Sequence, residues 1–549
     1  MPIEDISYRY IREKAQARII PSINEFIQTE QIKVWCIALF LGALVGIAAT
    51  LFRLGIGAVQ WIWLGDSSES AMGSLTTQTE WYFLFFPPII GGIIVAALIS
   101  YLCPLKRPEN VSDVIEGRAK AGADLTLKRG LSSALVSVIS LGFGASSGRE
   151  GPVIHLGASL SAWFYRHFDL SKINMKMLYA SGVAAAISAS FNAPIAGVIF
   201  AHEVILQHYS IRTSVPVVIA STIASVIARA AFGAEVTFSI PAYQITSYWE
   251  FPAFILLGVT CAVVAVLFQL SLIMTDWTSR QLRVPIWTKP IMAGILVGSI
   301  AIHYPQILGV GYAATDAALN QELSISIMLA LILVKTIATS ITLGGKFGGG
   351  IFSPALYIGA MAGGSFGLIA AQFFPEMASS HGLYAILGMA AVSAALLGAP
   401  FSTTLIVFEL TGGYTLSIAL LLTVAISTGL HLAFHGRCFF HYQLEMRGQF
   451  LQEGPHREVV KVMSVQDFME LLDYNDRRDF DPDLEEEFVL YTDTMEVVLQ
   501  AFETTKKPRL AVVRKTTDVD FRLMGWVTHV EAMRSFNSAL IAASKEEHR

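Results

Sequence analysis

Residues 148–152, Gly-Arg-Glu-Gly-Pro, place a carboxylate where an anion could bind. Glu150 stands between two glycines, directly before the apolar run 153–163. Glycine lets backbone N–H groups approach a ligand closely, and a helix N-terminus carries a partial positive charge. A carboxylate inside a membrane is costly unless it lines a water-filled path or has a partner. The pattern indicates an anion-binding helix start in which Glu150 competes with the anion. The alternative is an ordinary helix cap at a surface.

The composition indicates a membrane protein. The chain is 54% hydrophobic and 15% charged, with a mean hydropathy of +0.55. Residues 451–549 contain 20 acidic and 13 basic residues, a net charge of −7, which leaves 23 acidic and 25 basic residues in the first 450. This distribution predicts a large membrane domain, in contact with lipid, followed by a small acidic soluble domain. No nucleic-acid partner is expected.

The first 33 residues predict a cytoplasmic N-terminus. They are amphipathic and basic, and basic segments beside a membrane span stay in the cytoplasm. The first apolar run begins near Val34 and is long enough to span, so no cleaved signal peptide is expected. The four cysteines have no paired or ligand spacing, which predicts neither a disulfide nor a metal site.

The apolar segments alternate between long and short. Runs long enough to span a membrane occur at 34–63, 82–103, 213–232, 251–275, 288–303, 325–343 and 414–434. Shorter Gly- and Ala-rich pieces occur at 131–145, 152–164, 178–190, 194–206, 354–373, 382–397 and 400–410. Half-length helices are tolerated in a membrane only where they are buried in protein or line a cavity. The pattern therefore predicts a transporter or channel with a site near the midplane.

An internal repeat relates the two halves of this region. Pro152 is followed by Gly157-Ala158, and Pro354 is followed at the same spacing by Gly359-Ala360. Likewise, Ala193-Pro194 precedes Glu203 and Ala399-Pro400 precedes Glu409, each by nine residues from proline to glutamate. Such duplicated halves commonly build a shared site at their interface from helix ends.

These features resemble the CLC family of chloride channels and proton-coupled chloride exchangers. The family's G-R-E-G-P motif stands at 148–152, and its G-x-F-x-P motif stands at 350–354. The resemblance covers the predicted membrane domain, residues 31–447, behind a cytoplasmic segment at 1–30. It implies an all-α, multi-pass, internally repeated fold with broken half-helices. It also implies a location in a bacterial inner membrane, with both termini cytoplasmic.

The resemblance further implies a homodimer with one anion pathway in each subunit. Glu150 would be the gate, and backbone N–H groups of Ile351 and Phe352 would coordinate the central anion. The neighbouring motif residues expected at the anion site are Gly148, Arg149, Gly151 and Gly350. Chloride is the implied transported ligand, and no cofactor is implied.

Residues 108–113 depart from the family motif G-S-G-I-P, whose middle residue usually contacts the central anion. Here the stretch reads Pro-Glu-Asn-Val-Ser-Asp. Counting back from Glu150 without gaps puts Glu109 at the key position, where it would repel an anion, whereas a one-residue deletion puts Asn110 there. Asn110 or Ser112 could donate to an anion. The alternative is a reshaped loop in which only the backbone matters.

The segment after Pro194 departs from the pattern of the exchangers. Glu203 matches a structural glutamate of the family, and Val204 falls where exchangers carry an internal proton-transferring glutamate. Valine cannot carry a proton and is what family channels have there. His202 could relay protons, because histidine titrates near neutrality. The alternative is a structural histidine.

Two further positions bear on the anion path. The family's tyrosine that caps the central anion falls on Phe440, which keeps the ring and loses the hydroxyl, unless a rotated helix brings Tyr442 there. Lys346 stands in a glycine-rich break before the second motif, where it would raise the local anion concentration at a pore entrance. The alternative for Lys346 is a snorkelling interfacial side chain.

The tail predicts an acidic linker, 448–487, and a small α/β cytoplasmic domain, 488–549. Strands are expected at 488–490, 509–513 and 523–527, and helices at 495–505 and 531–543. Residues 525–531 resemble the signature of a single CBS module, with Glu531 in place of the usual Asp. Because these modules normally work in pairs, nucleotide binding is not expected, and a regulatory or dimer-stabilising role is.

The sequence thus predicts a chloride-transporting membrane protein and not an enzyme. Valine at 204 favours a passive channel gated by Glu150. The second hypothesis is a proton–chloride exchanger that takes protons through water or His202. A third, a membrane enzyme or sensor that uses His202 and Glu203 as an acid–base or metal pair, lacks a nucleophile or further ligand motif nearby.

Overall fold

The computed structural model describes residues 31–68, 71–75, 79–119, 125–168, 170, 172–233, 237–238, 245–375, 378–412, 416–447, 449, 463–472, 479–480, 487–515 and 521–548. Its contacts divide the chain into two compact units. One runs to Gln449, and the other comprises Gln207–Arg212 and the described residues after 450. The predicted N-terminal segment 1–30 and most of the predicted linker lie outside the described residues.

The first unit is all-helical. Its helices are α3 (Gln31–Leu64), α4 (Trp81–Leu102), α5 (Val111–Ala119), α6 (Leu127–Gly142), α7 (Glu150–Phe168), α8 (Lys172–Phe191), α9 (Pro194–Phe200), α10 (Ile211–Phe232), α11 (Phe251–Gln281), α12 (Thr288–Ala301), α13 (Tyr312–Leu319), α14 (Ile325–Gly344), α15 (Phe352–Phe373), α16 (His381–Leu397), α17 (Pro400–Thr411), α18 (Ser417–His435) and α19 (Phe439–Glu445). A π-helical turn, Ala201–Leu206, continues α9. Short 3-10 turns lie at Ala71–Ser74, Tyr248–Glu250 and Pro305–Ile307.

Within the described residues, seven helices are long and apolar enough to cross a membrane. The predicted run 288–303 is not among them, because α12 has only 14 residues. Conversely, the predicted short piece 354–373 belongs to the 22-residue α15, most of which is buried inside the protein. The 34 residues of α3 give a length of about 51 Å at 1.5 Å per residue, so this helix must tilt in a bilayer of about 30 Å.

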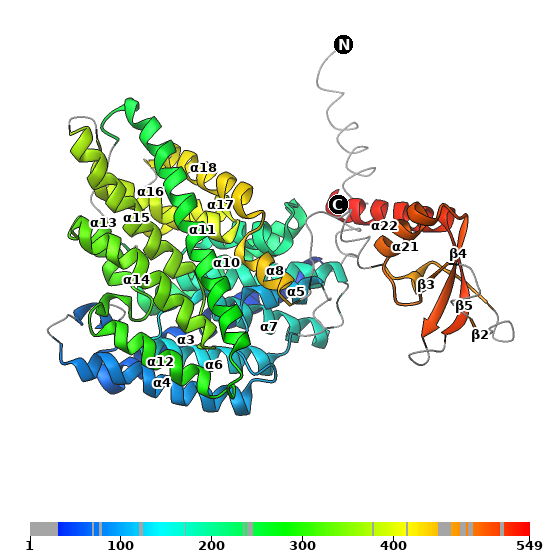
Figure 1. Cartoon of the computed structure of the whole chain (residues 1–549), viewed down its shortest axis with the longest axis horizontal. Coiled ribbons are helices and arrows are strands. Elements are labelled where there is room, and N and C mark those ends of the chain that lie inside the picture. Colours follow the sequence, from blue (N-terminus) through cyan, green and yellow to red (C-terminus); the bar gives the residue numbers. More distant parts are fainter. Residues whose placement is uncertain are drawn as a thin grey trace, which may run out of the picture. The chain divides into compact units, whose positions relative to one another are not determined.

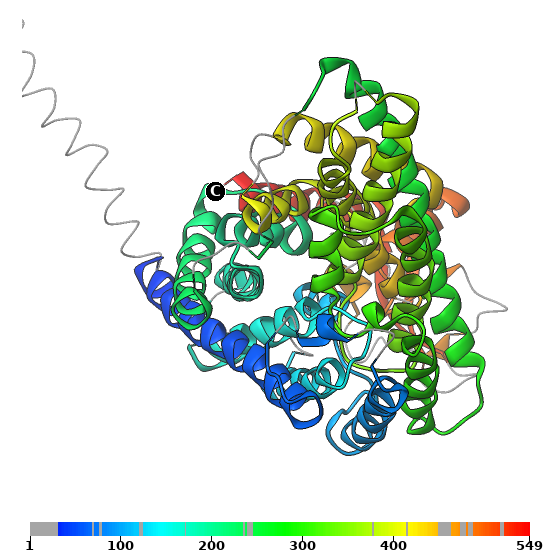
Figure 2. The same ribbon diagram turned by 90° about the vertical axis from the view of Figure 1, so that its left-hand side faces the viewer.

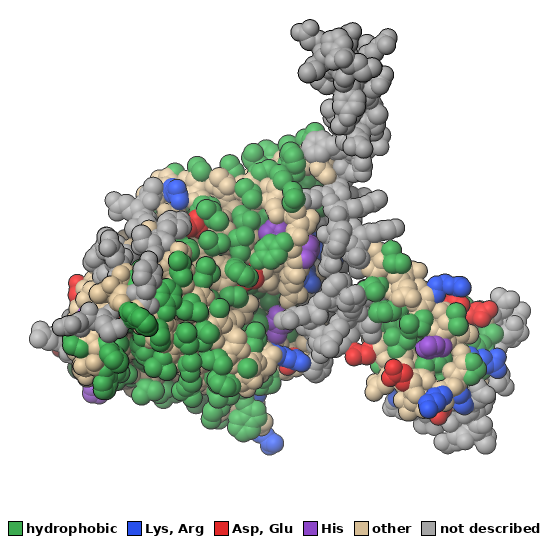
Figure 3. Space-filling model, turned by 90° about the horizontal axis from the view of Figure 1, so that it is seen from above, with side chains coloured by type: hydrophobic (Ala, Val, Ile, Leu, Met, Phe, Trp, Pro, Cys, Tyr) green, Lys and Arg blue, Asp and Glu red, His purple; other side chains and the backbone are tan. Residues whose placement is uncertain are grey.

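The surface of this unit fits lipid. Large apolar side chains such as Leu51, Leu54 and Ile62 are more than half exposed on α3, and Figure 3 shows green apolar side chains over most of the visible face of the helical unit. Charged side chains are sparse on that face. The prediction of a helical, multi-pass membrane domain is confirmed.

The two halves of the unit repeat one another. The helices α3 to α10 of the first half correspond in order to α11 to α18 of the second half. Figure 2 shows the first half (blue to teal) and the second half (green to yellow) as two largely separate groups. Proline begins both α9 and α17, where its missing N–H costs no helical hydrogen bond. Asn192 and Gly398 adopt left-handed φ values of 58° and 67° in the equivalent turns before these helices.

Two glutamates connect the halves reciprocally. Glu203, at the end of the first half's α9 segment, accepts hydrogen bonds from the N–H groups of Phe401 (3.1 Å) and Ser402 (2.8 Å) at the start of α17. Glu409, at the end of α17, accepts from Ile195 (3.2 Å) and Ala196 (2.8 Å) at the start of α9. A carboxylate at a helix N-terminus satisfies its orphan N–H groups. This exchange of caps requires an approximate two-fold axis between the halves.

The second unit is a small α/β domain (Figure 1). Its strands β3 (Phe488–Leu490), β4 (Arg509–Lys515) and β5 (Phe521–Thr528) and its helices α21 (Met495–Thr505) and α22 (His529–His548) confirm the predicted order of strand, helix, two strands and helix. β3 pairs with β4 in parallel, and β4 pairs with β5 antiparallel.

This domain begins earlier in the chain than predicted. The short strands β1 (Glu470–Leu471) and β2 (Asp479–Phe480), placed in the expected linker, both pair antiparallel with β5. Val465 and Phe468 join Val489 and Met495 in its hydrophobic core. Polar composition disguised this segment, because both residues of β1 and Asp479 of β2 are exposed, and Phe480 alone of these four residues is buried.

Candidate functional site

Two unwound loops meet in the interior of the helical unit. One joins α6 to α7 and the other joins α14 to α15. Gly148 N donates to Gly350 O at 2.7 Å, and Gly350 N donates to Gly148 O at 2.6 Å, as an isolated antiparallel bridge. The two sequence motifs are therefore bonded to each other at equivalent residues, 202 positions apart. A Cβ on Gly350 would come within 2.9 Å of the Gly151 backbone nitrogen, so this approach requires glycine.

Glu150 lies at the start of α7 with its carboxylate directed at the start of α15. The side chain is buried, and Ser353 Oγ donates a short hydrogen bond to Glu150 Oε1. The other carboxylate oxygen, Oε2, lies against Gly148, where a Cβ would collide with it. The carboxylate therefore occupies a position beside the N-terminal end of α15, which is where a bound anion would be stabilised. Its role as a gate stays a prediction.

A cavity of about 440 Å³ opens beside this carboxylate. It brings together most of the residues predicted at the anion path: Glu150, Gly151, Gly350, Ile351, Phe352, Asn110, Phe440 and Lys346. Tyr442, the alternative to Phe440, also lines it. We call it the gate cavity.

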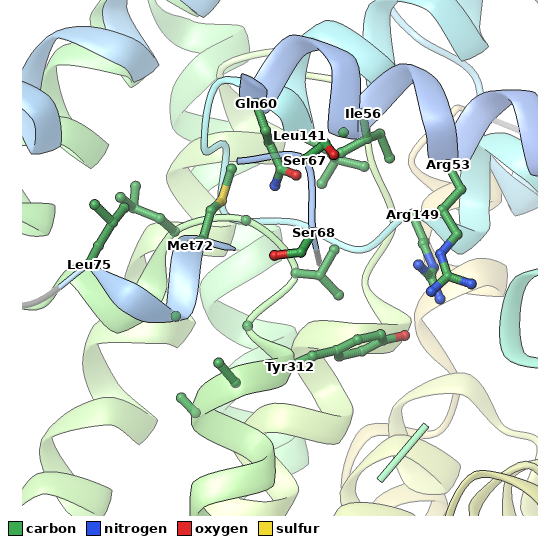
Figure 4. Close-up of a pocket in the computed structure, with 18 of the residues that line it drawn as sticks. Arg53, Ile56, Gln60, Ser67, Ser68, Met72, Leu75, Leu141, Arg149 and Tyr312 are labelled. Carbon is green, nitrogen blue, oxygen red and sulfur yellow. The ribbon is translucent and has the colours of Figure 1, made fainter. Parts of the chain in front are cut away.

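Arg149 does not face the gate cavity. Its Nη2 donates to Ser190 O at 2.7 Å, and the side chain lines a different cavity of about 780 Å³ together with Arg53 and Tyr312 (Figure 4). We call this one the arginine cavity. The consecutive residues Arg149 and Glu150 thus contribute to two separate cavities, on either side of the loop that carries them.

The structure places the three candidate residues of the departed motif differently. Glu109 is buried at the wall of the gate cavity, with its carboxylate oxygens 2.7 Å from Arg129 Nε and 2.9 Å from His155 Nε2. Asn110 lies beside Gly151 and lines the gate cavity, whereas Ser112 does not line it. Glu109 and Asn110 therefore both border the gate cavity, and binding of an anion by Asn110 stays a prediction.

Gln443 on α19 is a residue that sequence reasoning missed. Its Oε1 accepts hydrogen bonds from Asn110 Nδ2 at 3.2 Å and from Ser112 Oγ at 2.6 Å. The same helix carries Phe440 into the cavity wall. Gln443 therefore ties the reshaped loop to α19, and no spacing in the sequence relates residues more than 300 positions apart. Ser353 was also missed, although a hydroxyl one residue before the proline of the second motif was a usable signal.

Two arginines that bind Asp113 also connect the reshaped loop to the segment after α19. Asp113 Oδ2 lies 3.0 Å from Arg107 Nη1, and Asp113 Oδ1 lies 2.8 Å from Arg447 Nη1. Burial alone would raise the pKa of the Asp113 carboxyl, but the two guanidinium groups hold that pKa below its ordinary value. The carboxylate therefore stays ionised and joins α5 to Arg447, two residues after the end of α19.

The residues proposed for proton transfer are engaged in structural contacts. Val204 and His202 are buried in the π-helical turn, and His202 Nε2 lies 3.1 Å from Ser214 Oγ. Glu203 caps α17. Lys346, with a left-handed φ of 69°, places its Nζ 3.1 Å from Asp276 Oδ1 at the gate cavity. It is a paired cation in the cavity wall, with about a fifth of its side chain exposed.

Proteins named as chloride channels are similar in sequence to this chain. The family model described as "Voltage gated chloride channel" matches residues 91–431, a range that contains both motif loops. Chloride channel protein CLC-f of Arabidopsis thaliana is 28% identical over 421 residues, which cover 71% of this chain and 53% of that protein. The putative chloride channel protein ClcB-like of Ralstonia nicotianae is 28% identical, with 70% of this chain and 90% of that protein covered. This chain therefore spans about half the length of the plant protein and most of the bacterial one.

A solved structure has the same fold. A slow cyanobacterial Cl⁻/H⁺ antiporter superimposes with a TM-score of 0.67 at 22% identity, covering 75% of this chain and 97% of the other. At this identity the likeness concerns the fold alone.

Proposed function

Because this chain belongs to the voltage-gated chloride channel family, we propose that it carries chloride across a membrane by passive, channel-like flow gated by Glu150. The observation that carries the proposal is the position of the Glu150 carboxylate, hydrogen-bonded to Ser353 at the start of α15. A chloride ion would be stabilised by the same helix end, so carboxylate and anion would exclude each other. Protonation, or displacement of the side chain, would open the path.

The central anion would lie in the gate cavity. Ile351 and Phe352 begin α15 there, and backbone N–H groups hold an anion without a permanent full countercharge. Asn110 would supply a side-chain donor where the family uses a serine. Phe440 would cover the site with a ring and no hydroxyl, which favours a weakly held anion. Lys346 and Arg107 in the cavity wall would raise the local anion concentration.

We propose that chloride flow is not coupled to proton movement, because residue 204 is a valine. A coupled exchanger needs a titratable group or an ordered water path between one side of the membrane and Glu150. The buried segment offers valine at the expected position, and the neighbouring Glu203 already accepts two backbone hydrogen bonds. Removing the carboxylate from that cap would take the acceptor away from the N–H groups of Phe401 and Ser402.

The second candidate is a proton–chloride exchanger. It is favoured by His202, which is buried one residue from Glu203. Ser214 Oγ, 3.1 Å from its ring nitrogen, would be the next group in such a relay.

We also propose a homodimer in a bacterial inner membrane, with both termini cytoplasmic and one pathway in each subunit. Exposed apolar side chains on α9, α17 and α18, among them Ile195, Phe401 and Ile418, would be covered by lipid or by the second copy.

The test is a proton-flux measurement in sealed vesicles that contain the full chain and a trapped pH indicator. A chloride gradient should move no protons uphill, and the reversal potential should follow chloride alone. Uphill movement that survives His202→Ala would overturn the channel proposal in favour of a water-borne path. Uphill movement lost in His202→Ala, but kept in a variant of the exposed histidine, His303→Ala, would make His202 the proton carrier.

A further inference from the structure

Lys335 is a cation buried in the middle of a membrane-crossing helix. It is the single charged residue of α14, which is long and apolar enough to span, and its side chain is fully buried. A charge at this depth is costly, and an intramembrane ionisable residue usually marks a functional site. Lys335 lines neither the gate cavity nor the arginine cavity, so any effect on transport must pass through its neighbours.

The partners of Lys335 are neutral. Its Nζ donates to Ile307 O at 2.9 Å and to Gly309 O at 3.0 Å, and it lies 5.1 Å from the centroid of the Tyr357 ring. Two carbonyl oxygens and a ring face stabilise an ammonium ion. No described carboxylate forms an ion pair with it. The cation is therefore held without a countercharge in contact with it.

The helices that pack against α14 bring no charge to Lys335. α15 has no charged residue, α12 has Lys289 in its first turn, and α11 has Asp276 and Arg280 near its end. Asp276 pairs with Lys346, just beyond the end of α14. The eleven residues from Lys335 to Lys346 correspond to about 16 Å along a helix. These charges therefore gather at the C-terminal end of α14, away from Lys335.

The nearest buried acid in the structural chain of contacts is the gate itself. Tyr357 stands one helical turn after Ser353 on α15, and Ser353 Oγ donates to the Glu150 carboxylate. A turn is about 5.4 Å long, which puts the Lys335 ammonium and this carboxylate on the order of 10–15 Å apart. Unit charges interact appreciably over such a distance inside a protein, where the effective dielectric constant is about 20.

Lys335 and its helix also contact the loop that carries the gate. Gly309, whose carbonyl accepts from Lys335, donates its N–H to Gly144 O at 3.2 Å in the loop between α6 and α7. Thr339, one turn after Lys335, places its Oγ1 3.4 Å from Ser146 Oγ in the same loop. The face of α14 that carries Lys335 is therefore directed at the gate.

The first half of the repeat has no equivalent cation. The offset of 202 residues that relates the motif loops makes Ser133 of α6 the counterpart of Lys335, and Ser133 Oγ accepts from Glu109 N at 2.9 Å. Each side chain thus bonds to the backbone before a short helix, α5 in one half and α13 in the other. A neutral serine suffices for that contact, so the charge of the lysine serves another purpose.

We propose that Lys335 is a positioning residue of the anion path, whose ammonium group balances the negative charge at the start of α15. It stabilises either occupant of that position, the ionised Glu150 carboxylate or a chloride ion. When Glu150 is protonated at low chloride, the position loses its negative charge. Lys335 therefore opposes protonation of the gate and favours binding of chloride. The effect on the gate rests on the proposed function of Glu150.

The other charged groups around Glu150 are already paired. Arg149, its neighbour in the sequence, donates to Ser190 O, and the acids of the gate cavity lie against cations of their own. The charged residues that line the gate cavity besides Glu150 are Arg107, Glu109, Asp276, Arg280, Lys346 and Arg447. Substitution of Lys335 leaves all of these pairs in place.

The test is chloride flux through vesicles that contain the full chain with Lys335→Met. At low chloride, the external pH of half-maximal flux should rise by about half to one pH unit, because the cation no longer favours the ionised carboxyl. The chloride concentration of half-maximal flux should rise about threefold to tenfold for the same reason. Lys335→Arg keeps the charge and should keep both values. The control is Lys289→Met, which also removes an ammonium group bonded to a backbone carbonyl and should change neither.

The Glu150→Gln background separates this inference from the proposed function. In that background the pH dependence should be absent with and without Lys335→Met, whereas Lys335→Met should still weaken the chloride dependence. A pH profile that persists in Glu150→Gln alone would refute the gate. If Glu150→Gln abolishes the profile but Lys335→Met leaves both midpoints unmoved, the inference is overturned and the gate stands.

A purely structural role of Lys335 has its own signature. Flux that falls equally at every pH and chloride concentration in Lys335→Met, with unmoved midpoints, would also overturn the inference. Lys335→Gln, whose amide can still donate to a carbonyl, takes the place of Lys335→Met if that variant does not assemble. Failure of both neutral variants to assemble would assign Lys335 to folding and overturn the inference as well.

Discussion

The starts of α7 and α15 are equivalent positions in the two halves, yet they differ in chemistry. Glu150 begins one helix and Phe352 begins the other, 202 residues later, and the glycines two residues before them pair with each other. The first half places a carboxylate at this junction. The second half contributes the Ser353 hydroxyl that binds the carboxylate and a helix start without a charge. A nearly symmetric scaffold thus brings a charged group from one half to the helix end of the other.

At the two glutamates that cap helices, in contrast, the two halves have the same chemistry. Glu203 and Glu409 occupy equivalent positions, carry the same side chain, and make the same pair of backbone hydrogen bonds across the two-fold axis. Where the halves agree in sequence, the residues hold the fold together. Where they differ, as at Glu150 and Phe352, we place the function.

The largest effect is expected where the two loops touch. Gly350→Val should reduce chloride flux at least about tenfold, because its Cβ would meet the Gly151 backbone and force the loops apart. Vesicle efflux measures the loss, and gel filtration checks assembly. In the control, Gly429→Val, a Cβ meets nothing within 4 Å, so flux should be normal. A folded Gly350→Val protein with normal flux would refute this placement of the anion site.

The cap glutamates should behave as a matched pair. Glu203→Gln and Glu409→Gln should each destabilise the protein by about 1–3 kcal/mol, since each loses a charge-assisted interaction with two N–H groups. Thermal unfolding in detergent should show similar decreases for both. Glu80→Gln is the control, because Glu80 precedes α4 without a side-chain capping bond. A large effect of one cap and none of the other would break the structural equivalence.

A smaller effect is expected from the hydroxyl that holds the carboxylate. Ser353→Ala should raise flux at neutral pH about threefold to tenfold, because Glu150 would lose one hydrogen bond and leave its position more readily. The control is Ser393→Ala, whose buried hydroxyl donates to Met389 O of its own helix. A fall in flux would indicate that Ser353 serves the anion and not the carboxylate.

Much of the scaffold was predictable, because it follows from local patterns. Gly and Pro mark the starts of α7, α9, α15 and α17, and the spacing of the repeat anticipated which loops would meet. In the second unit, α21 and β3 fall at the predicted residues. Gly525 in the signature is explained by β1, because a Cβ there would collide with Glu470 O.

Side-chain directions in the loops were not predictable. Glu109 stands one residue from Asn110, yet it turns to Arg129 and His155 while Asn110 turns to Gln443. Arg149 and Glu150 likewise contribute to different cavities. Unwound backbone has no periodicity, so the direction of each side chain depends on partners that are distant in the sequence.

The central claim is that Glu150, and not its counterpart Phe352, gates the anion path. The most direct measurement is the external pH dependence of chloride flux through Glu150→Gln in reconstituted vesicles, because glutamine mimics the protonated carboxyl. We predict that flux rises and that its pH dependence largely disappears, whereas Phe352→Leu keeps the pH profile of the unaltered chain. A Glu150→Gln protein with unchanged flux and an unchanged pH profile would remove Glu150 from the gate.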